Sequence, residues 1–493
     1  MKNKPNVLLI SPQIITGKEQ IRKVQVPLGL ASLGAMLELN DCAIVRIFDT
    51  VVEGYNNVVP LENSSNLLVT GSSNEAVFDE ISAFKPDVIG VSCLYSSQAV
   101  CAFSMISAIK KKYNNIPIIL GGNHASVSYD VIMHNNPGID FIIRGESEYT
   151  FLEFVKKIGT GTDVTGVPSL VWREGSEIRN NPLSPVIGSL DDLPFPAWHL
   201  LSMESYFEIA MPPNPFIQSG RVGVIMTSRG CPFKCYFCSS TNFFGHRFRP
   251  MSSSCVIEMV RLLVKSYGIK ELQIVDDTFT TDFRRVIEIC KGLKQFNLRI
   301  TLPNGIRADS PKNRMQRAEM FHVLREAGCV QIAIAAEHGD QDFLNNVINK
   351  KLNLDETNAT CDFAHRAGLL VHCNFIMGFP FETSELRNRT IEYANKLQAD
   401  SFSVSLATPL PGTRMWDIAE ENDLFLDGFN ESRVIFSQAS IKPHDIEVEE
   451  LEQLVKRLNH DLNANAVKRN PDSKKKYNLF KEKDSSSDRK YLH

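Results

Sequence analysis

Short apolar runs alternate with amphipathic stretches along the first 157 residues. The apolar runs lie at residues 6–10, 43–49, 87–92, 117–122 and 141–145, with helical patterns between them near residues 27–39, 98–113 and 124–134. Near-continuous apolar runs of this length are typical of parallel strands covered on both faces. Residues 1–157 are therefore predicted to form an α/β domain with a flavodoxin-like, doubly wound sheet. Ligands of such sheets bind outside the carboxyl ends of the strands.

The pattern changes between residues 158 and 220. Glycine, proline and asparagine punctuate this segment, and Pro194 and Pro196 prevent a continuous helix. We expect residues 158–220 to be a linker.

The alternation of strands and helices resumes at residue 221. Apolar runs lie at residues 222–228, 272–276, 299–303, 330–337, 370–378 and 401–407, and a helical pattern follows each of them. About six βα units predict a partial (β/α)6 barrel, similar to a TIM barrel, over residues 221–435, with its chemistry at the carboxyl ends of the strands. A small helical segment is predicted at residues 436–466. The polar tail at residues 467–493 is expected to be disordered.

Composition and charge narrow the class of protein. The 493 residues exceed what one hydrophobic core usually supports. With 53 basic and 57 acidic side chains the formal net charge is -4, so nucleic acid is not an expected partner. The amino terminus lacks the apolar core and cleavage site of a signal peptide, and no apolar stretch is long enough to span a bilayer. We therefore expect a cytoplasmic protein with no membrane span.

Three of the eleven cysteines are clustered. Cys231, Cys235 and Cys238 lie in the segment SRGCPFKCYFCSS, directly after the first predicted barrel strand. Without a secretory signal, the cysteines are expected to be reduced rather than joined in disulfides. Most of the other eight are expected to pack as small hydrophobic residues. These eight are Cys42, Cys93, Cys101, Cys255, Cys290, Cys329, Cys361 and Cys373.

The clustered thiols favour an iron–sulfur cluster. Cysteine thiolates ligate such clusters, and a cubane with three protein ligands leaves one iron open to another molecule. A structural zinc site usually has four ligands, and neither a fourth nearby cysteine nor a suitably spaced histidine follows. Zinc and a purely structural cluster remain alternatives.

The spacing CxxxCxxC, with Phe237 before the third cysteine, resembles the signature of the radical S-adenosylmethionine (radical SAM) superfamily. The resemblance implies that Cys231, Cys235 and Cys238 hold a 4Fe–4S cluster and that S-adenosylmethionine chelates the open iron. An electron from the reduced cluster then yields methionine and a 5′-deoxyadenosyl radical, which requires an external donor such as flavodoxin or ferredoxin. The role of the protein is to bind and orient the cofactors and to exclude water from them.

Other strand ends match segments that this superfamily uses. The resemblance implies cofactor contacts for Asp276, Asp277, Arg307, Glu337 and Gly378. The acidic pair could face the cofactor's ammonium group or a substrate cation, or could cap a helix. Glu337 resembles the residue near the ribose, and an unpaired carboxylate ending an apolar strand favours a bound partner.

Gly378 lies in MGFPFE, which looks like the adenine-proximal G-x-P-G-E stretch, although Phe381 stands where glycine is commoner. Gly378 and Pro380 could also simply turn the chain. The segment TPLPGT at residues 408–413 resembles the Pro-Gly-Thr stretch after the last barrel strand.

The first domain resembles the cobalamin-binding domain fused ahead of many radical SAM enzymes. The segments that carry this resemblance are PLGLASLGAML, VSCL, GGNHAS and RGESEYTFLEF. Ser92, Leu94, Gly121 and Gly122 are expected to contact cobalamin, because small residues let the backbone approach a flat corrin.

The segment SPQIITGKEQ lacks the Asp-x-His-x-x-Gly element that would place a histidine beneath cobalt. The cobalt is then expected to have water or no lower protein ligand. His124, on a predicted loop, is expected to be solvated or to act as a cap. A domain that keeps this fold without a corrin is the alternative.

The combined resemblance implies a cobalamin-dependent radical SAM methyltransferase that acts on an unactivated carbon, or phosphorus, of a small metabolite or natural-product intermediate. One S-adenosylmethionine methylates reduced cobalamin, and a second supplies the radical that removes a substrate hydrogen. An oxidative cyclase or ring-rearrangement enzyme of the same architecture is the first alternative. Methylthiolation is disfavoured because the amino-terminal cysteines are dispersed, and a non-catalytic carrier is a further alternative. The catalytic residues are not specified, and Tyr236, Asn304 and His372 are only candidates for substrate contact.

Overall fold

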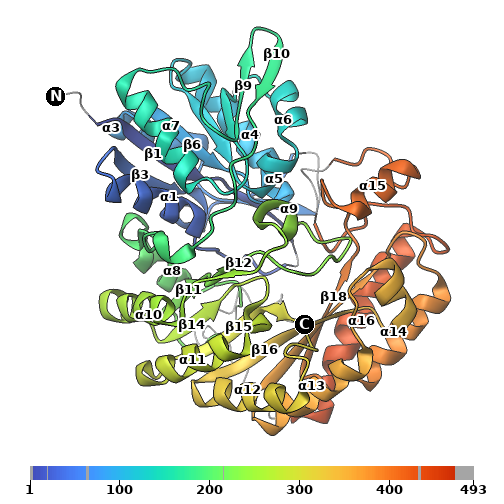
Figure 1. Cartoon of the computed structure of the whole chain (residues 1–493). Helices are drawn as coiled ribbons and strands as arrows, with labels where there is room; N and C mark the ends of the chain where they lie inside the picture. Colours follow the sequence, from blue (N-terminus) through green and yellow to red (C-terminus); the bar gives the residue numbers. More distant parts are fainter. Residues whose placement is uncertain (1–3, 19, 63–65, 215, 431–434, 472–493) are drawn as a thin grey trace. The chain divides into compact units, whose positions relative to one another are not determined.

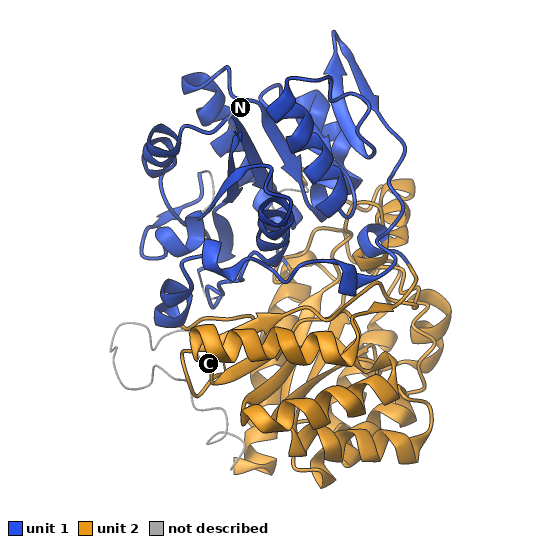
Figure 2. Ribbon diagram, turned by 60° about the vertical axis from the view of Figure 1, so that its left-hand side comes forward, with its two compact units in different colours: residues 1–209, 242–245, 430–435 blue, residues 210–241, 246–429, 436–493 orange. Residues whose placement is uncertain are grey.

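The chain forms two compact units. The computed structural model describes residues 4–18, 20–62, 66–214, 216–430 and 435–471. Unit 1 comprises residues 1–209, 242–245 and 430–435, and unit 2 the remainder (Figure 2). Residues 158–209, predicted as most of a linker, group with unit 1.

A seven-stranded sheet forms the centre of unit 1, with the order β10-β9-β8-β7-β6-β1-β3. Its parallel strands are β1 (Asn6–Ser11), β3 (Ile44–Asp49), β6 (Val88–Ser92), β7 (Ile118–Gly121) and β8 (Phe141–Ile143). Their spatial order is 2-1-3-4-5, which is the flavodoxin-like order. The main helices are α1 (Leu28–Leu39), α3 (Asn74–Phe84), α4 (Ala99–Lys112) and α7 (Glu148–Thr160). The predicted fold of the first domain is confirmed.

Unit 1 also contains short strands that the apolar pattern did not predict. β2 (Ile14–Gly17), β5 (Leu67–Thr70) and β4 (Val58–Pro60) form a small antiparallel sheet. The hairpin of β9 (Leu170–Glu174) and β10 (Glu177–Asn180) extends the main sheet beside β8, and α8 (Met203–Ile209) follows. Most positions of β4 and β10 are exposed, so these strands lack the apolar runs by which strands are recognised.

Unit 2 is built on six parallel strands arranged in sequence order. They are β11 (Val222–Ile225), β14 (Glu271–Ile274), β15 (Arg299–Ile306), β16 (Cys329–Glu337), β17 (Leu370–Met377) and β18 (Ser401–Leu406). The helices α10 (Ser253–Tyr267), α11 (Phe283–Leu293), α12 (Arg314–Glu326), α13 (Leu354–Arg366) and α14 (Ser384–Lys396) connect successive strands and cover the sheet (Figure 1). The predicted partial (β/α)6 barrel is confirmed.

The last strand of the barrel is covered by the helix α16 (Val448–Arg469). Asn463 accepts a hydrogen bond from the backbone N of Phe402 (2.9 Å) and donates to its carbonyl (3.0 Å). Asn459 does the same at Val404 (both 2.8 Å). Two side-chain amides therefore take the place of a neighbouring strand, which satisfies an edge that would otherwise be open.

The tail predicted at residues 467–493 lies largely outside the described residues, although α16 continues as far as Arg469. Among the helices that the structure describes, none combines the length and the apolar character needed to cross a membrane.

Candidate cofactor sites

The three clustered cysteines lie in a loop of unit 2 that follows β12 (Ser228–Arg229). All three are partly buried, and the backbone N of Cys238 donates to the carbonyl of Cys235 (3.1 Å). Residues 348–349, from a distant part of the chain, bind the cysteine loop through two hydrogen bonds. Tyr236 N donates to the carbonyl of Ile348 (3.0 Å), and the Asn349 side chain donates to the carbonyl of Lys234 (3.0 Å). The loop is therefore fixed by backbone contacts rather than by its thiols.

The three thiols of the cysteine loop lie close enough to influence one another's protonation. Burial is the main cause that raises the pKa of Cys231 to about 11, and the charges of Cys238, Asp277 and Cys235 act in the same direction. In the described residues, no three His, Cys, Asp or Glu side chains converge on a single ion. A cubane binds each thiolate through a different iron, so thiols spread around one turn suit a cluster. Binding iron would remove the thiol protons.

Aromatic rings join the cysteine loop to the segment after β17. The Phe379 ring lies 5.9 Å from that of Tyr236 and 6.0 Å from that of Phe237, between ring centroids. Tyr236, a candidate for substrate contact, is buried in this group. The Arg307 guanidinium lies 4.0 Å from the centroid of the Phe233 ring. The segments that contain Phe379 and Arg307, both of which include predicted site residues, therefore contact the cysteine loop.

Glu337 and Arg307 belong to one buried network. Glu337 Oε1 lies 3.0 Å from Lys350 Nζ. Arg307 donates to the carbonyls of Lys350 (2.6 Å) and Lys351 (2.5 Å) and pairs with Asp309. Burial raises the pKa of Cys235, and the positive charge of Lys350 opposes this shift in part.

The carboxylate of Glu337 therefore has a partner within the protein, and the argument that it lacks one is wrong. Lys350 lies thirteen residues beyond it, a separation that carries no sequence signal. A cofactor contact at Glu337 stays a prediction.

The two acidic residues after β14 do different things. Asp276 is 2% exposed, and its oxygens accept from Thr227 N, Thr227 Oγ1 and Ser228 Oγ, at 2.5 to 2.6 Å. It braces the chain just before the cysteine loop. Asp277 accepts from Ser240 Oγ (2.9 Å), and its charge contributes to the raised pKa of Cys231. The cap of α11 is Asp282, so neither residue caps that helix.

Gly378 has a backbone reason to be glycine. Its φ is 81°, and an added Cβ would lie 2.7 Å from a methyl group of Leu451. Its N donates to Glu382 Oε2 (2.6 Å). Its contact with a cofactor stays a prediction. Asn304, near the carboxyl end of β15, donates to the carbonyl of Val275 (2.7 Å).

The predicted corrin residues come together at one edge of unit 1. Ser92 and Gly121 are partners in the register of β6 and β7. Gly122 has φ 114°, and an added Cβ would lie 2.5 Å from the carbonyl oxygen of Cys93. Leu94 is 39% exposed and Tyr95 45%. Exposed apolar side chains beside glycines fit a large flat ligand.

His124 is not the solvated or capping residue that we predicted. It is 3% exposed within α5 (Asn123–Val127), and its Nδ1 lies 3.0 Å from Ser96 Oγ. Burial lowers its pKa to about 4. The segment was predicted to be a loop, but a helix begins directly after the double glycine. The side chain of His124 is therefore buried.

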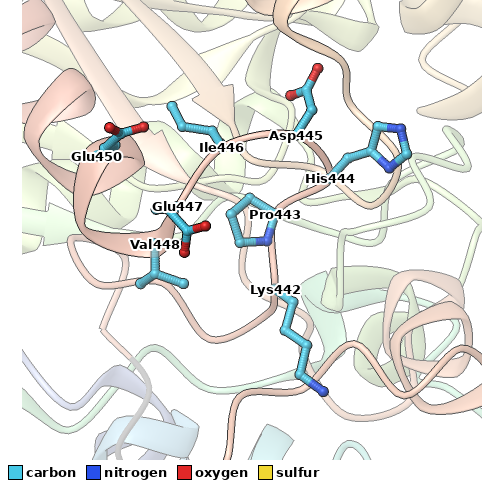
Figure 3. A pocket seen from close by; sticks show the side chains of 8 residues that line it. All are labelled: Lys442, Pro443, His444, Asp445, Ile446, Glu447, Val448 and Glu450. Atoms are coloured by element: carbon cyan, nitrogen blue, oxygen red, sulfur yellow. The ribbon is translucent and has the colours of Figure 1, made fainter.

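A separate hollow of about 430 Å³ lies at the start of α16 (Figure 3). Residues 442–448 and Glu450 line it, and Asp445 there pairs with Arg387. None of the predicted site residues lines this hollow.

Two parts of the chain match known families. Residues 19–155 match the B12 binding domain, and residues 225–394 match the radical SAM superfamily. The chain is 31% identical to a protein of Pyrococcus horikoshii named as an uncharacterized methyltransferase, over 86% of this chain and 85% of that protein. It is 30% identical to cytidylyl-2-hydroxyethylphosphonate methyltransferase of Streptomyces wedmorensis, over 93% of this chain and 90% of that protein.

A solved structure has a similar fold. It is the radical S-adenosylmethionine methyltransferase TsrM from Kitasatospora setae with cobalamin and a 4Fe–4S cluster bound, with a TM-score of 0.67 and 18% identity. The similarity covers 85% of this chain and 78% of that one. Both resemblances drawn from the sequence are confirmed by the family matches.

Proposed function

Because the chain belongs to the cobalamin-dependent radical SAM enzymes, we propose that it methylates an unactivated carbon, or phosphorus, of a small metabolite or natural-product intermediate. The observation that carries this proposal is the methyltransferase name of two relatives that match over 85% and 90% of their own lengths. An external one-electron donor such as flavodoxin or ferredoxin, and a cytoplasmic location, belong to the same proposal.

The chain's residues have distinct tasks in this reaction. When bound, the cluster and S-adenosylmethionine supply a 5′-deoxyadenosyl radical, and cobalamin supplies the methyl group. Cys231, Cys235 and Cys238 would hold the cluster. Glu337 and Arg307 would orient S-adenosylmethionine beside it.

Four further residues complete the cofactor sites. Asp276 and Asp277 keep the cysteine loop in place through their hydrogen bonds to the chain on either side of it. Leu94 and Gly122 would receive the corrin at the edge of unit 1.

Polar side chains on the inner face of the barrel support the proposal of a small polar substrate. Half-buried residues alternate along β17 and β18, and the register places His372 beside Ser401 and Asn374 beside Ser403. His372 Nδ1 lies 2.8 Å from Ser401 Oγ. Among the described residues, the Asn374 amide nitrogen and the Ser403 hydroxyl have no hydrogen-bond partner. Such groups are available to a ligand's oxygen atoms.

The amino ends of three other strands of the barrel, β14, β15 and β16, are closed. Asn214 accepts a hydrogen bond from Gln273 at its carbonyl (2.8 Å) and donates to Gln331 Oε1 (2.7 Å), and all three are buried. Glu271 accepts from the backbone N of Gln218 and pairs with Arg299 at 2.7 Å. A substrate would therefore enter at the carboxyl ends, where the cofactor residues lie.

The test uses reconstituted, reduced protein with methyl-labelled S-adenosylmethionine, and cytidylyl-2-hydroxyethylphosphonate as the first substrate in a panel. Methyl transfer predicts labelled product with one S-adenosylhomocysteine and one 5′-deoxyadenosine per methyl group. Formation of 5′-deoxyadenosine with an altered but unlabelled product would instead support the cyclase or ring-rearrangement alternative. Absence of reductive cleavage would support a carrier.

A further inference from the structure

Two residues other than glycine have left-handed backbones at neighbouring strand ends of unit 2. Glu337 ends β16 with φ 66°, and Phe381 lies in the turn after β17 with φ 63°. Residues that have a Cβ rarely adopt this backbone conformation, and they keep it only where the surrounding structure holds them. Glycine would adopt it without strain. Some nearby group must therefore hold each of these residues.

A buried pair of side chains connects the two strained positions. His338 directly follows Glu337, and Glu382 directly follows Phe381. His338 Nε2 lies 3.0 Å from Glu382 Oε1, and both side chains are 0% exposed. The pair thus joins the ends of β16 and β17 immediately after the residues that need to be held.

The other polar atoms of the pair are bonded to the backbone. Asp340 N donates to His338 Nδ1 (3.0 Å), which leaves the imidazole proton on Nε2, facing Glu382. Gly378 N donates to the second carboxylate oxygen of Glu382 (2.6 Å), and Glu382 N donates to the carbonyl of Phe379 (3.0 Å). No polar atom of the pair is left over for a ligand, so its task is to hold the chain.

The pair also packs against the cysteine loop through aromatic rings. The His338 ring lies 4.5 Å from that of Phe343 and 6.3 Å from that of Phe379, between centroids. Phe379 in turn contacts the rings of Tyr236 and Phe237. The two strand ends and the cysteine loop therefore form one packed unit.

We propose that His338 and Glu382 are positioning residues for the S-adenosylmethionine site. They hold Glu337 and the Gly378–Glu382 turn in their left-handed conformations before the cofactor binds. Binding then requires no ordering of these segments, which favours affinity. The inference concerns cofactor binding and is independent of which substrate is methylated.

The first test compares Glu382→Gln and His338→Ala with the wild type. The dissociation constant of S-adenosylmethionine is measured by equilibrium dialysis of anaerobically reconstituted protein, together with iron content and the EPR spectrum of the reduced cluster. We expect affinity to fall about tenfold, as is common when supporting residues around a site are removed. Iron content should not change, and the spectral change on adding S-adenosylmethionine should require a higher concentration.

The second test introduces Phe381→Gly into the Glu382→Gln variant. Glycine adopts the left-handed conformation without support, so the double variant should recover much of the lost affinity, measured against Phe381→Gly alone. A role of Glu382 in charge balance alone predicts no recovery. This comparison also tests the positioning role of the pair if His338→Ala does not fold.

His322→Ala is the matched control, because His322 pairs with Glu326 at 3.2 Å on the surface and is 69% exposed. It should leave the dissociation constant unchanged. The proposal is overturned if Glu382→Gln binds S-adenosylmethionine as tightly as the wild type, or if glycine at position 381 restores nothing. Neither result would bear on methyl transfer, which is measured separately.

Discussion

The carboxyl ends of the strands carry different kinds of residue in the two units. In unit 1 the edge consists of Ser92, two glycines and the exposed side chains of Leu94 and Tyr95. In unit 2 the corresponding ends contain a buried ion pair, Glu337–Lys350, and a buried hydrogen-bonded pair, His338–Glu382. A large, flat corrin needs room and apolar contact, whereas a small, charged cofactor beside a metal cluster needs fixed polar groups. The difference predicts that a corrin site in unit 1 depends on space and that an S-adenosylmethionine site in unit 2 depends on charge.

The largest expected effect comes from removing a cluster ligand in unit 2. Cys235→Ala should abolish cluster retention and reductive cleavage of S-adenosylmethionine, because two thiolates cannot hold the cubane that three hold. Iron content and the visible spectrum report the loss, while cobalamin binding by unit 1 should persist. Cys42→Ala, which replaces a scattered thiol, is the control and should keep its iron. Full cleavage activity in the Cys235 variant would contradict the assignment.

The next effect tests the dependence of unit 2 on charge. Lys350→Met leaves Glu337 without its cation in a buried position, and breaking such a pair costs about 3–5 kcal/mol. Chemical denaturation should show the loss. The matched control is Lys351→Met, since the neighbouring lysine is exposed and its Nζ donates to the carbonyl of Asn345. Equal stability of the two variants would mean that Glu337 is not held by this pair.

A smaller effect tests the dependence of unit 1 on space. Gly122→Val places a side chain at φ 114° and 2.5 Å from the Cys93 carbonyl, which should cost about 2–4 kcal/mol and weaken cobalamin binding. Gly161→Val is the control, because Gly161 has φ 66° but no atom within 4 Å of the added Cβ. Gly161 also has a positive φ, in the less strained left-handed helical region, and it lacks the clash. Spectroscopic titration with cobalamin distinguishes them: comparable losses in both would refute the role of close approach.

The smallest effect is a pH dependence within unit 1. Asp49, at the end of β3, accepts from Tyr206 Oη and Val51 N, and burial raises its pKa to about 6. The folded state therefore binds this proton more tightly than the unfolded chain. Its contribution is fully present below the ordinary Asp pKa and is lost as pH rises through about 6.

Between pH 5 and pH 7 the wild type should lose about 1.4 kcal/mol relative to Asp49→Asn. Denaturant unfolding at the two pH values measures this difference. A constant difference between the two proteins would show that Asp49 does not titrate in this range.

Local patterns predicted the two sheets and the cysteine loop. Runs such as residues 6–10 and 370–378 are apolar because both faces of a parallel strand are covered, so the signal lies within the strand itself. The spacing of Cys231, Cys235 and Cys238 is likewise local. The strands β4 and β10 were not predicted, because short strands whose side chains are mostly exposed need no apolar run.

The amino-acid sequence by itself determined the alternation of strands and helices and the division of the chain into two cofactor-binding parts, and it predicted the cluster ligands. Only the tertiary structure decided which groups support them. Lys350 meets Glu337 across 13 positions, His338 meets Glu382 across 44, and Asn463 covers Phe402 across 61. Such contacts follow no periodicity, because they depend on which strand ends and helices the completed fold brings together.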